Sequence, residues 1–269
     1  MLRRAVWADQ FYPAHPARLH RELERCLGSE APQKIARPIG CVVPHAGYMY
    51  SGPVAGAVYS RLELPDRAIV LCPNHTGRGA PLAILSEGQW QTPLGSVPVE
   101  AGLAAALKKR CRLLSEDADA HRQEHSLEVQ LPFLQKLCSG LAFVPIAVGT
   151  EAFEALELLG EARAGTVQAA ARPVLVVASS DMNHFENDER TRIKDRRAID
   201  RVLALEPRGL YDTVRQERIS MCGYCPTVAM LIAAKRLGAT QAELVRYGTS
   251  ADASGDYSRV VGYAGMVVW

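Results

Sequence analysis

The feature that most constrains this chain is a series of short, continuously apolar segments separated by stretches with helical periodicity. Strands are predicted at residues 39–43, 68–72, 82–85, 142–148, 174–178 and 262–268. Helices are predicted at residues 15–27, 54–61, 100–111, 127–137, 152–170, 188–205 and 223–237. Strands without alternation of polar and apolar residues are typical of a sheet covered on both faces. The pattern therefore predicts an α/β fold, a layered sheet with helices on both faces.

The chain has 269 residues, a length that α/β folds often reach in one domain. No repeat, low-complexity tract or proline-rich linker interrupts it, so we expect a single domain over residues 1–269. Gly88, Pro93, Gly95 and Pro98 punctuate the segment from residue 82 to residue 99. This segment is therefore predicted to form a hairpin-like excursion from the sheet.

Charge and cysteine content exclude several classes of protein. The 31 Lys and Arg residues nearly balance 29 Asp and Glu and are scattered, which gives no indication of nucleic acid or lipid binding. No apolar run approaches the roughly 20 residues of a membrane span, and the first residues lack the apolar segment of a signal peptide. The odd number of cysteines, 7, favours reduced thiols over a disulfide framework. We expect a cytoplasmic protein.

Polar side chains that carry chemistry directly follow three of the predicted strands. They are His45, His75, Asp181 and His184. In open α/β sheets, ligands bind beyond the carboxyl ends of the strands. Two histidines and one anionic ligand suit Fe, Zn, Cu or Ni and leave positions open for substrate and oxygen. The sequence therefore predicts a shared metal site at one edge of the sheet.

Cys222 lies directly before the helix predicted at residues 223–237, and three interpretations of it stay open. As a metal ligand it would be a thiolate, with its pKa lowered by the ion and the helix N-terminus. As a nucleophile it would need a base such as His184 or His125. As a structural residue it would be a small apolar filler. Its C-x-x-C pairing with Cys225 lacks the surroundings of a thioredoxin-like motif.

The segment HRQEHSLEVQLPFLQ is predicted to open a helix. Its order is E-H-x-x-E, which does not match the H-E-x-x-H of metalloproteases. His121 and His125 are four residues apart, so a ligand pair stays open. We expect His125 to lie near the pocket and to orient a ligand or the substrate, and Glu128 to hold local structure. Glu124 is interpreted as a first-turn residue that meets the helix dipole.

A turn of small residues is predicted after His45. It carries Tyr48, Tyr50 and Ser51, which would line the pocket or simply pack.

Taken in order, the motifs of the chain resemble those of the Memo family, which includes protein B of the AmmeMemoRadiSam system. The matching stretches are FYP (residues 11–13), PHAGYMYSG, PNHTG, TPLGSVPVE, EHSLEVQLPFLQ, VPIAVG, SSDMNH, CGYCP and VVGYAG. The resemblance implies a fold similar to that of class III extradiol dioxygenases, whose iron(II) is held by two histidines and a glutamate. A further histidine of those enzymes acts as acid and base.

Carried onto this chain, the resemblance implies roles for individual residues. His45 and His75 match the two histidine ligands, and Cys222 matches the family's cysteine at the position of the dioxygenase glutamate. Asp181 and His184 match the remaining polar residues of the pocket, and His184 resembles the acid/base histidine. A thiolate is softer than a carboxylate and favours Cu(I) or Zn as well as Fe.

These implications lead to one leading hypothesis and two alternatives. The leading hypothesis is a metal-dependent oxidoreductase with iron or copper, or else zinc, on His45, His75 and Cys222. Its catalytic residues would be His184, Asp181 and His125. Its partners would be an unknown small molecule or peptide and a radical SAM protein, without nucleic acid or membrane. The alternatives are a peptide- or protein-binding module that uses the same pocket without turnover, and an enzyme with Cys222 as nucleophile.

Overall fold

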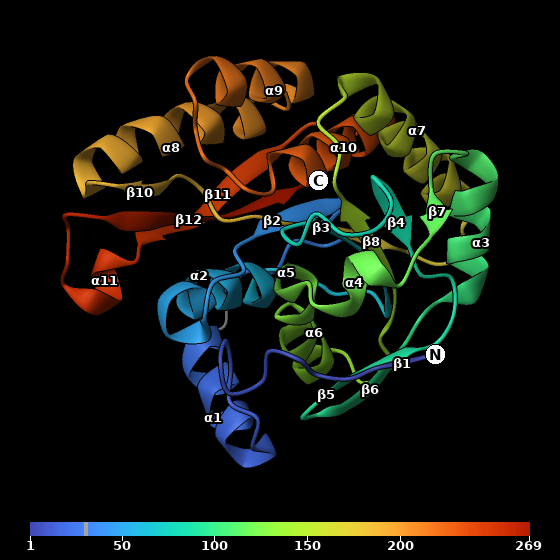
Figure 1. Cartoon of the computed structure of the whole chain (residues 1–269), viewed down its shortest axis with the longest axis horizontal. Coiled ribbons are helices and arrows are strands. Elements are labelled where there is room, and N and C mark those ends of the chain that lie inside the picture. The colour runs from blue at the N-terminus through green and yellow to red at the C-terminus, as the bar shows by residue number, and fades with distance from the viewer. Residues whose placement is uncertain (30–31) are drawn as a thin grey trace.

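The computed structural model describes residues 1–29 and 32–269. Its main element is a mixed sheet. The strands of this sheet are β2 (Gly40–Val43), β3 (Arg67–Pro73), β4 (Leu82–Ile84), β7 (Ser115–Glu116), β8 (Ala142–Val148), β9 (Leu175–Ser179), β10 (His184–Glu186), β11 (Ala242–Thr249) and β12 (Val260–Val268). Their order across the sheet is β10-β12-β2-β9-β3-β8-β4-β7, with β11 paired to β12 (Figure 1).

The centre of the sheet is parallel, and this determines where the polar strand ends meet. Strands β2, β9, β3 and β8 are parallel neighbours. Strands β12 and β4, which flank them, are antiparallel to them. Val43 is in register with Ser179, and Leu71 is in register with Ala178. The residues that follow β2, β9 and β3 therefore emerge side by side at one edge of the sheet.

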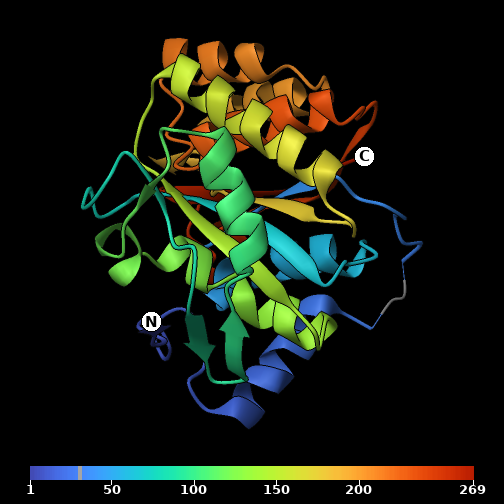
Figure 2. The same ribbon diagram turned by 90° about the vertical axis from the view of Figure 1, so that its right-hand side faces the viewer.

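Helices cover both faces of the sheet (Figure 2). They are α1 (Pro16–Leu27), α2 (Tyr48–Ser60), α3 (Ala101–Arg110), α4 (Asp119–Arg122), α5 (His125–Glu128), α6 (Leu131–Leu137), α7 (Phe153–Ala169), α8 (Asp188–Leu203), α9 (Pro207–Gln216), α10 (Tyr224–Arg236) and α11 (Ala251–Ser254). Helices α3, α7, α8, α9 and α10 contribute to one apolar core, and α1, α2, α5 and α6 to the other.

Successive strand residues divide between the two cores. In β3, Ile69 and Leu71 pack into the core on the α10 face, whereas Val70 and Cys72 pack into the core on the α2 face. This alternation explains the continuously apolar strands, because both faces are buried. The predicted α/β class with helices on both faces is confirmed.

The excursion predicted around residues 82–99 is a hairpin next to the main sheet. Strands β5 (Gln89–Thr92) and β6 (Gly95–Pro98) pair antiparallel, and β1 (Leu2–Arg3) adds in parallel to β5. No helix in the described part of the chain has the length and apolar content required to cross a membrane.

The helix predicted at residues 54–61 begins six residues earlier, because the glycines before it are not turn residues. A Cβ built on Gly52 would lie 2.5 Å from Cys26 Sγ, and one on Gly56 would lie 2.1 Å from the Cys26 carbonyl oxygen. These glycines therefore allow α2 to approach α1 closely. Pro53 lies inside the helix.

The turn predicted after His45 is therefore wrong. Tyr48, Tyr50 and Ser51 are all in α2.

The helix predicted at residues 127–137 is two helices. Helix α5 ends at Glu128, and α6 begins at Leu131 with Pro132 in its first turn. Proline has no N–H to donate to the carbonyl of the residue four positions earlier, and this missing bond favours a break in the helix here. The break leaves His125 on a short helix of its own.

Helix α9 and strand β11 were not predicted. Helix α9 buries only Leu210 and Val214, which is too narrow an apolar face to stand out in a charged segment that also contains Gly209. Strand β11 lies beyond β12 with one neighbour only and is mostly half-buried. Neither element has a continuously apolar sequence.

Candidate metal centre

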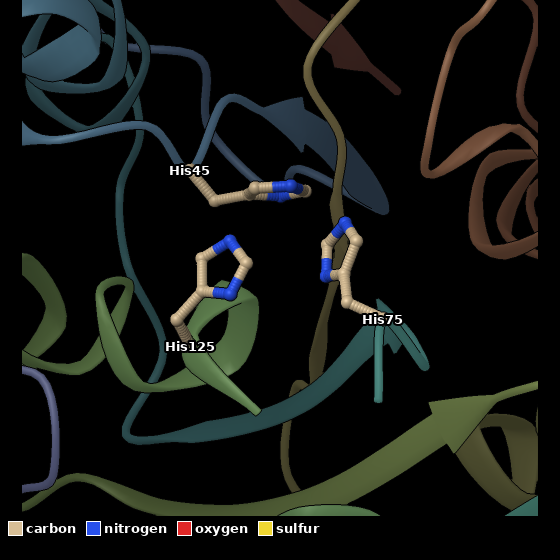
Figure 3. A group of neighbouring side chains, drawn as sticks. All are labelled: His45, His75 and His125. Atoms are coloured by element: carbon tan, nitrogen blue, oxygen red, sulfur yellow. The ribbon is translucent and has the colours of Figure 1, made fainter. Parts of the chain in front are cut away.

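Imidazoles from three separate elements converge at the carboxyl edge of the sheet (Figure 3). His45 follows β2, His75 follows β3, and His125 is the first residue of α5. One ring nitrogen of each lies within 4.8 Å of those of the other two. Among the residues that the structure describes, they form the one group of three or more His, Cys, Asp or Glu side chains able to share an ion.

The ring of His45 is held as a single tautomer by Ser179. The Ser179 hydroxyl donates to the Ser126 carbonyl oxygen over 2.6 Å and accepts from Gln130 Nε2 over 2.8 Å. Its remaining lone pair faces His45 Nδ1 at 2.9 Å, so the hydrogen-bond network assigns the proton to Nδ1. Burial, and then the nearby His75, hold the pKa of His45 well below its usual value. The neutral ring therefore has a lone pair and no proton on Nε2.

Glu124 fixes His75 in the same way. Its carboxylate accepts from His75 Nδ1 over 2.8 Å and from the His75 backbone N–H over 2.7 Å. Although burial alone would raise the pKa of Glu124, hydrogen bonds from His75 and Ser126 hold it at about 2. The carboxylate is thus ionised and places the ring proton on Nδ1, which leaves Nε2 as the ligand atom. A carboxylate behind a metal-binding histidine is a common supporting contact.

His125 is held by ring packing instead of a short hydrogen bond. Its ring stacks on His75 at 4.6 Å between centroids and lies edge-on to His45 at 5.4 Å. Its Nδ1 is 3.6 Å from Glu124 Oε1, longer than a hydrogen bond. Burial, and then the neighbouring His45, lower the pKa of His125 to about 4. His125 is therefore also neutral near pH 7.

Cys222 lies beside His45 but is not part of the three-histidine group. Its Sγ is 3.2 Å from His45 Nε2. Cys222 is separated from α10 by the N-cap residue Gly223. Donors at about 2.1 Å (N) and 2.3 Å (S) from one tetrahedral ion lie about 3.6 Å apart, so the two atoms are close enough to share an ion. Burial, and then the charge of Asp181, raise the pKa of the thiol. A bound cation would lower this pKa again.

Asp181 fixes the backbone at His45. Its Oδ1 accepts the backbone N–H of His45 over 2.7 Å, and its Oδ2 lies 4.0 Å from His45 Nε2. Burial raises the pKa of Asp181. Its side chain is buried beside His45 and would add a negative charge there when ionised.

His184 is oriented by Ser220 and not by Asp181. His184 Nδ1 donates to the Ser220 carbonyl oxygen over 2.8 Å, so its Nε2 is unprotonated in the neutral ring. The side chain is half-buried. His184 therefore combines a fixed tautomer with access to solvent.

The structure also resolves the alternatives for the segment around α5. His121 is fully buried, lies edge-on to Trp90 at 5.8 Å and does not belong to the histidine group. A His121–His125 ligand pair is therefore wrong. Glu124, interpreted from the sequence as a first-turn residue, is the partner of His75. It does cap α5. Its partner His75 is 49 residues away in the chain, so the local sequence gives no indication of this contact.

The donor set fits a metal ion. In the metal-free protein the Cys222 thiol can donate to His45 Nε2 over 3.2 Å. A cation that displaced this proton would be bound by ring nitrogens and the sulfur together. Imidazole with a thiolate alongside suits Zn, Cu or Fe. The fold and the site together define an α/β protein with a group of three histidines that could hold a metal ion at the carboxyl edge of its sheet.

Comparison with known proteins agrees with this description. A family model described as Memo-like protein matches residues 3–267, and the chain belongs to the Memo family. It is 41% identical over 279 residues to a MEMO1 family protein of Methanopyrus kandleri, with 99% of each chain covered. A MEMO1 family protein of Methanothermobacter thermautotrophicus is 39% identical over 274 residues, which cover 98% of this chain and 99% of the relative.

A solved structure shares the fold at much lower sequence identity. The crystal structure of an uncharacterized protein from Escherichia coli K12 superposes with a TM-score of 0.56. The match covers 86% of this chain and 100% of the other, at 12% identity. This similarity supports the fold alone.

Proposed function

We propose that the protein is a metal-dependent oxidoreductase that holds iron or copper on His45, His75 and Cys222, with His125 completing the donor set. The observation that carries the proposal is the convergence of three imidazoles, with one ring nitrogen of each within 4.8 Å of those of the other two and a thiol 3.2 Å from His45 Nε2. A thiolate beside imidazoles suits redox-active iron or copper as well as zinc.

The residues around the ion would have separate roles in such an enzyme. A bound iron or copper ion would supply electron transfer and polarise the substrate. Ser179 and Glu124 keep the ligand nitrogens of His45 and His75 unprotonated. His184 holds a proton on Nδ1 against the Ser220 carbonyl, so its Nε2 is free to take a proton from the substrate and return it. Asp181 fixes the loop that carries His45.

Metal analysis tests the ligand set. The wild type, purified from medium supplemented with iron, copper and zinc, is compared with His45→Ala, His75→Ala and Cys222→Ser. His20→Ala is the matched control, because His20 is exposed on α1. We expect bound metal in the wild type and the control and a large loss in the three variants. Equal metal content in wild type and His45→Ala would refute the assignment.

A second measurement tests the redox chemistry. The copper-loaded protein should lose its Cu(II) electron paramagnetic resonance signal with ascorbate and regain it in air. A protein that retains only zinc, or whose bound copper cannot be cycled, would leave a metal centre without oxidoreductase chemistry and would contradict the proposal.

A further inference from the structure

The N-terminal residues 1–14, here called the N-terminal strap, run from β1 past α5 to the start of α1 (Figure 1). The strap carries the FYP stretch noted in the sequence. No part of the proposed metal chemistry uses it, yet it makes several contacts with the helix that carries His125.

Glu128 binds the strap to α5 with four hydrogen bonds. This carboxylate is fully buried and lies three residues after His125 on the same short helix. Its four donors are Arg3 Nη1 at 2.5 Å, the Val6 N–H at 3.1 Å, the Trp7 N–H at 2.9 Å and the Tyr12 hydroxyl at 2.6 Å. Burying a carboxylate costs free energy unless its oxygens accept hydrogen bonds, so Glu128 depends on all four donors staying in place.

The segment held by Glu128 places Phe11 against His125. The rings of Phe11 and His125 stack at 4.6 Å with an interplanar angle of 30°. His75 stacks on the same imidazole at 4.6 Å and 23°, and two rings at this distance cannot occupy one face. The imidazole of His125 therefore lies between Phe11 and His75. Trp7 closes its edge at 5.7 Å.

Two further contacts fix the turn that carries Phe11. The Tyr48 N–H donates to the Phe11 carbonyl oxygen over 2.8 Å, which ties the strap to the first turn of α2. Within the turn, the Asp9 N–H donates to the Tyr12 carbonyl oxygen over 2.7 Å. The position of Phe11 is thus set by contacts on both sides.

Packing is the main restraint on His125. The Nδ1 atoms of His45 and His75 each have a partner at 2.9 or 2.8 Å. In the described chain the His125 ring has no partner within 3.5 Å, and its nearest carboxylate oxygen is at 3.6 Å. Its orientation toward the other two imidazoles therefore depends on the aromatic side chains that surround it.

We propose that Phe11 and Glu128 are positioning residues of the metal centre: Glu128 holds the N-terminal strap, and the strap holds His125 in its ligand orientation through Phe11. This inference rests on the proposed metal site. It predicts that metal affinity depends on a residue of the strap that offers no ligand atom. Residues that support a metal ligand typically change metal affinity ten- to a hundredfold when they are replaced.

Cobalt(II) titration, followed by the ligand-field absorption of the bound ion, tests the inference. Phe11→Ala should bind Co(II) about tenfold more weakly and show an altered ligand-field spectrum. Phe11→Tyr, which keeps the stacking ring, should restore both. Glu128→Gln should resemble Phe11→Ala, because one amide oxygen cannot accept from four donors. Phe153→Ala, which removes a ring from α7 that contacts Tyr211, should bind like the wild type.

The outcomes separate this inference from the proposed function. Co(II) binding that is equal in the wild type and Phe11→Ala, with identical spectra, would overturn the inference and leave the metal site intact. A wild type that binds no Co(II) would overturn both. Thermal unfolding is recorded for each variant. If Phe11→Ala does not fold, Phe11→Leu, which removes the aromatic face and keeps most of the apolar volume, is measured in its place.

Discussion

The carboxylate behind His75 offers the most quantitative test of the metal site. Glu124 accepts four hydrogen bonds within 3.0 Å, from the Nδ1 and N–H of His75 and from the Oγ and N–H of Ser126. In Glu124→Gln, one of the two oxygens becomes an NH2 group. The substitution changes neither the size of the side chain nor any ligand atom, so its effect arises from hydrogen bonding and from the loss of one negative charge.

The amide has two orientations, and each carries a cost. If the amide oxygen takes the place of Oε1, the backbone N–H of His75 faces the NH2 group and is left unpaired, which costs about 1–3 kcal/mol of stability. If its oxygen takes the place of Oε2, the amide NH2 faces His75 Nδ1. The ring proton must then move to Nε2, and the lone pair that would bind metal is lost. We therefore expect metal affinity to fall ten- to a hundredfold, or about 1.4–2.7 kcal/mol.

The assay is Co(II) or Zn(II) titration of Glu124→Gln against the wild type, with urea unfolding of the metal-free proteins in parallel. Glu24→Gln is the matched control, because Glu24 is exposed and its carboxylate pairs with Lys136 on the surface. A Glu124→Gln protein that binds metal within twofold of the wild type and unfolds at the same urea concentration would refute the tautomer reasoning.

Three further predictions concern stability. Burial raises the pKa of Asp195 from 3.8 to about 7, so over this pH range the folded state keeps a proton that the unfolded state has released. The free energy of unfolding should therefore fall as the pH rises from about 4 to about 7, and urea unfolding of Asp195→Asn should not show this fall. Arg163 is fully buried with Nε and Nη1 unpaired among the described residues, so Arg163→Met should raise the free energy of unfolding by about 1–4 kcal/mol. A free energy of unfolding lower than that of the wild type would show that the charge is compensated. Gly56→Ala should lower the thermal midpoint by several degrees, since its Cβ would lie 2.1 Å from the Cys26 carbonyl oxygen; an unchanged midpoint would contradict the close packing of α1 on α2.

The elements that could be predicted are those whose signal is local. The predicted bounds of β8 match the observed ones, because its seven consecutive residues are apolar and all but Ala142 are buried. His45 and His75 stand out because each ends an apolar run. Helix α2 was placed too late, since Gly52 serves a contact with Cys26 that is distant in the chain and looks like a turn residue in the sequence.

The parts of the site that could not be predicted depend on long-range contacts. His125 was expected near the pocket, but its place between Phe11 and His75 follows from the break before α6 and from a strap more than a hundred residues earlier. Glu124 and Ser179 are ordinary polar residues in the sequence. They acquire their roles only when β9 and α5 meet behind the imidazoles. Residue type alone gives no indication of such contacts.

The central claim is that His45, His75 and His125 and the Cys222 thiol serve one ion. Crystals of the protein soaked in Co(II), with diffraction recorded on both sides of the cobalt absorption edge, would locate that ion directly. The account predicts a single strong anomalous peak between the three imidazoles, about 2.1 Å from His45 Nε2 and about 2.3 Å from Cys222 Sγ. A peak elsewhere on the molecule, or an ion bound by the histidines with the sulfur out of bonding range, would contradict it.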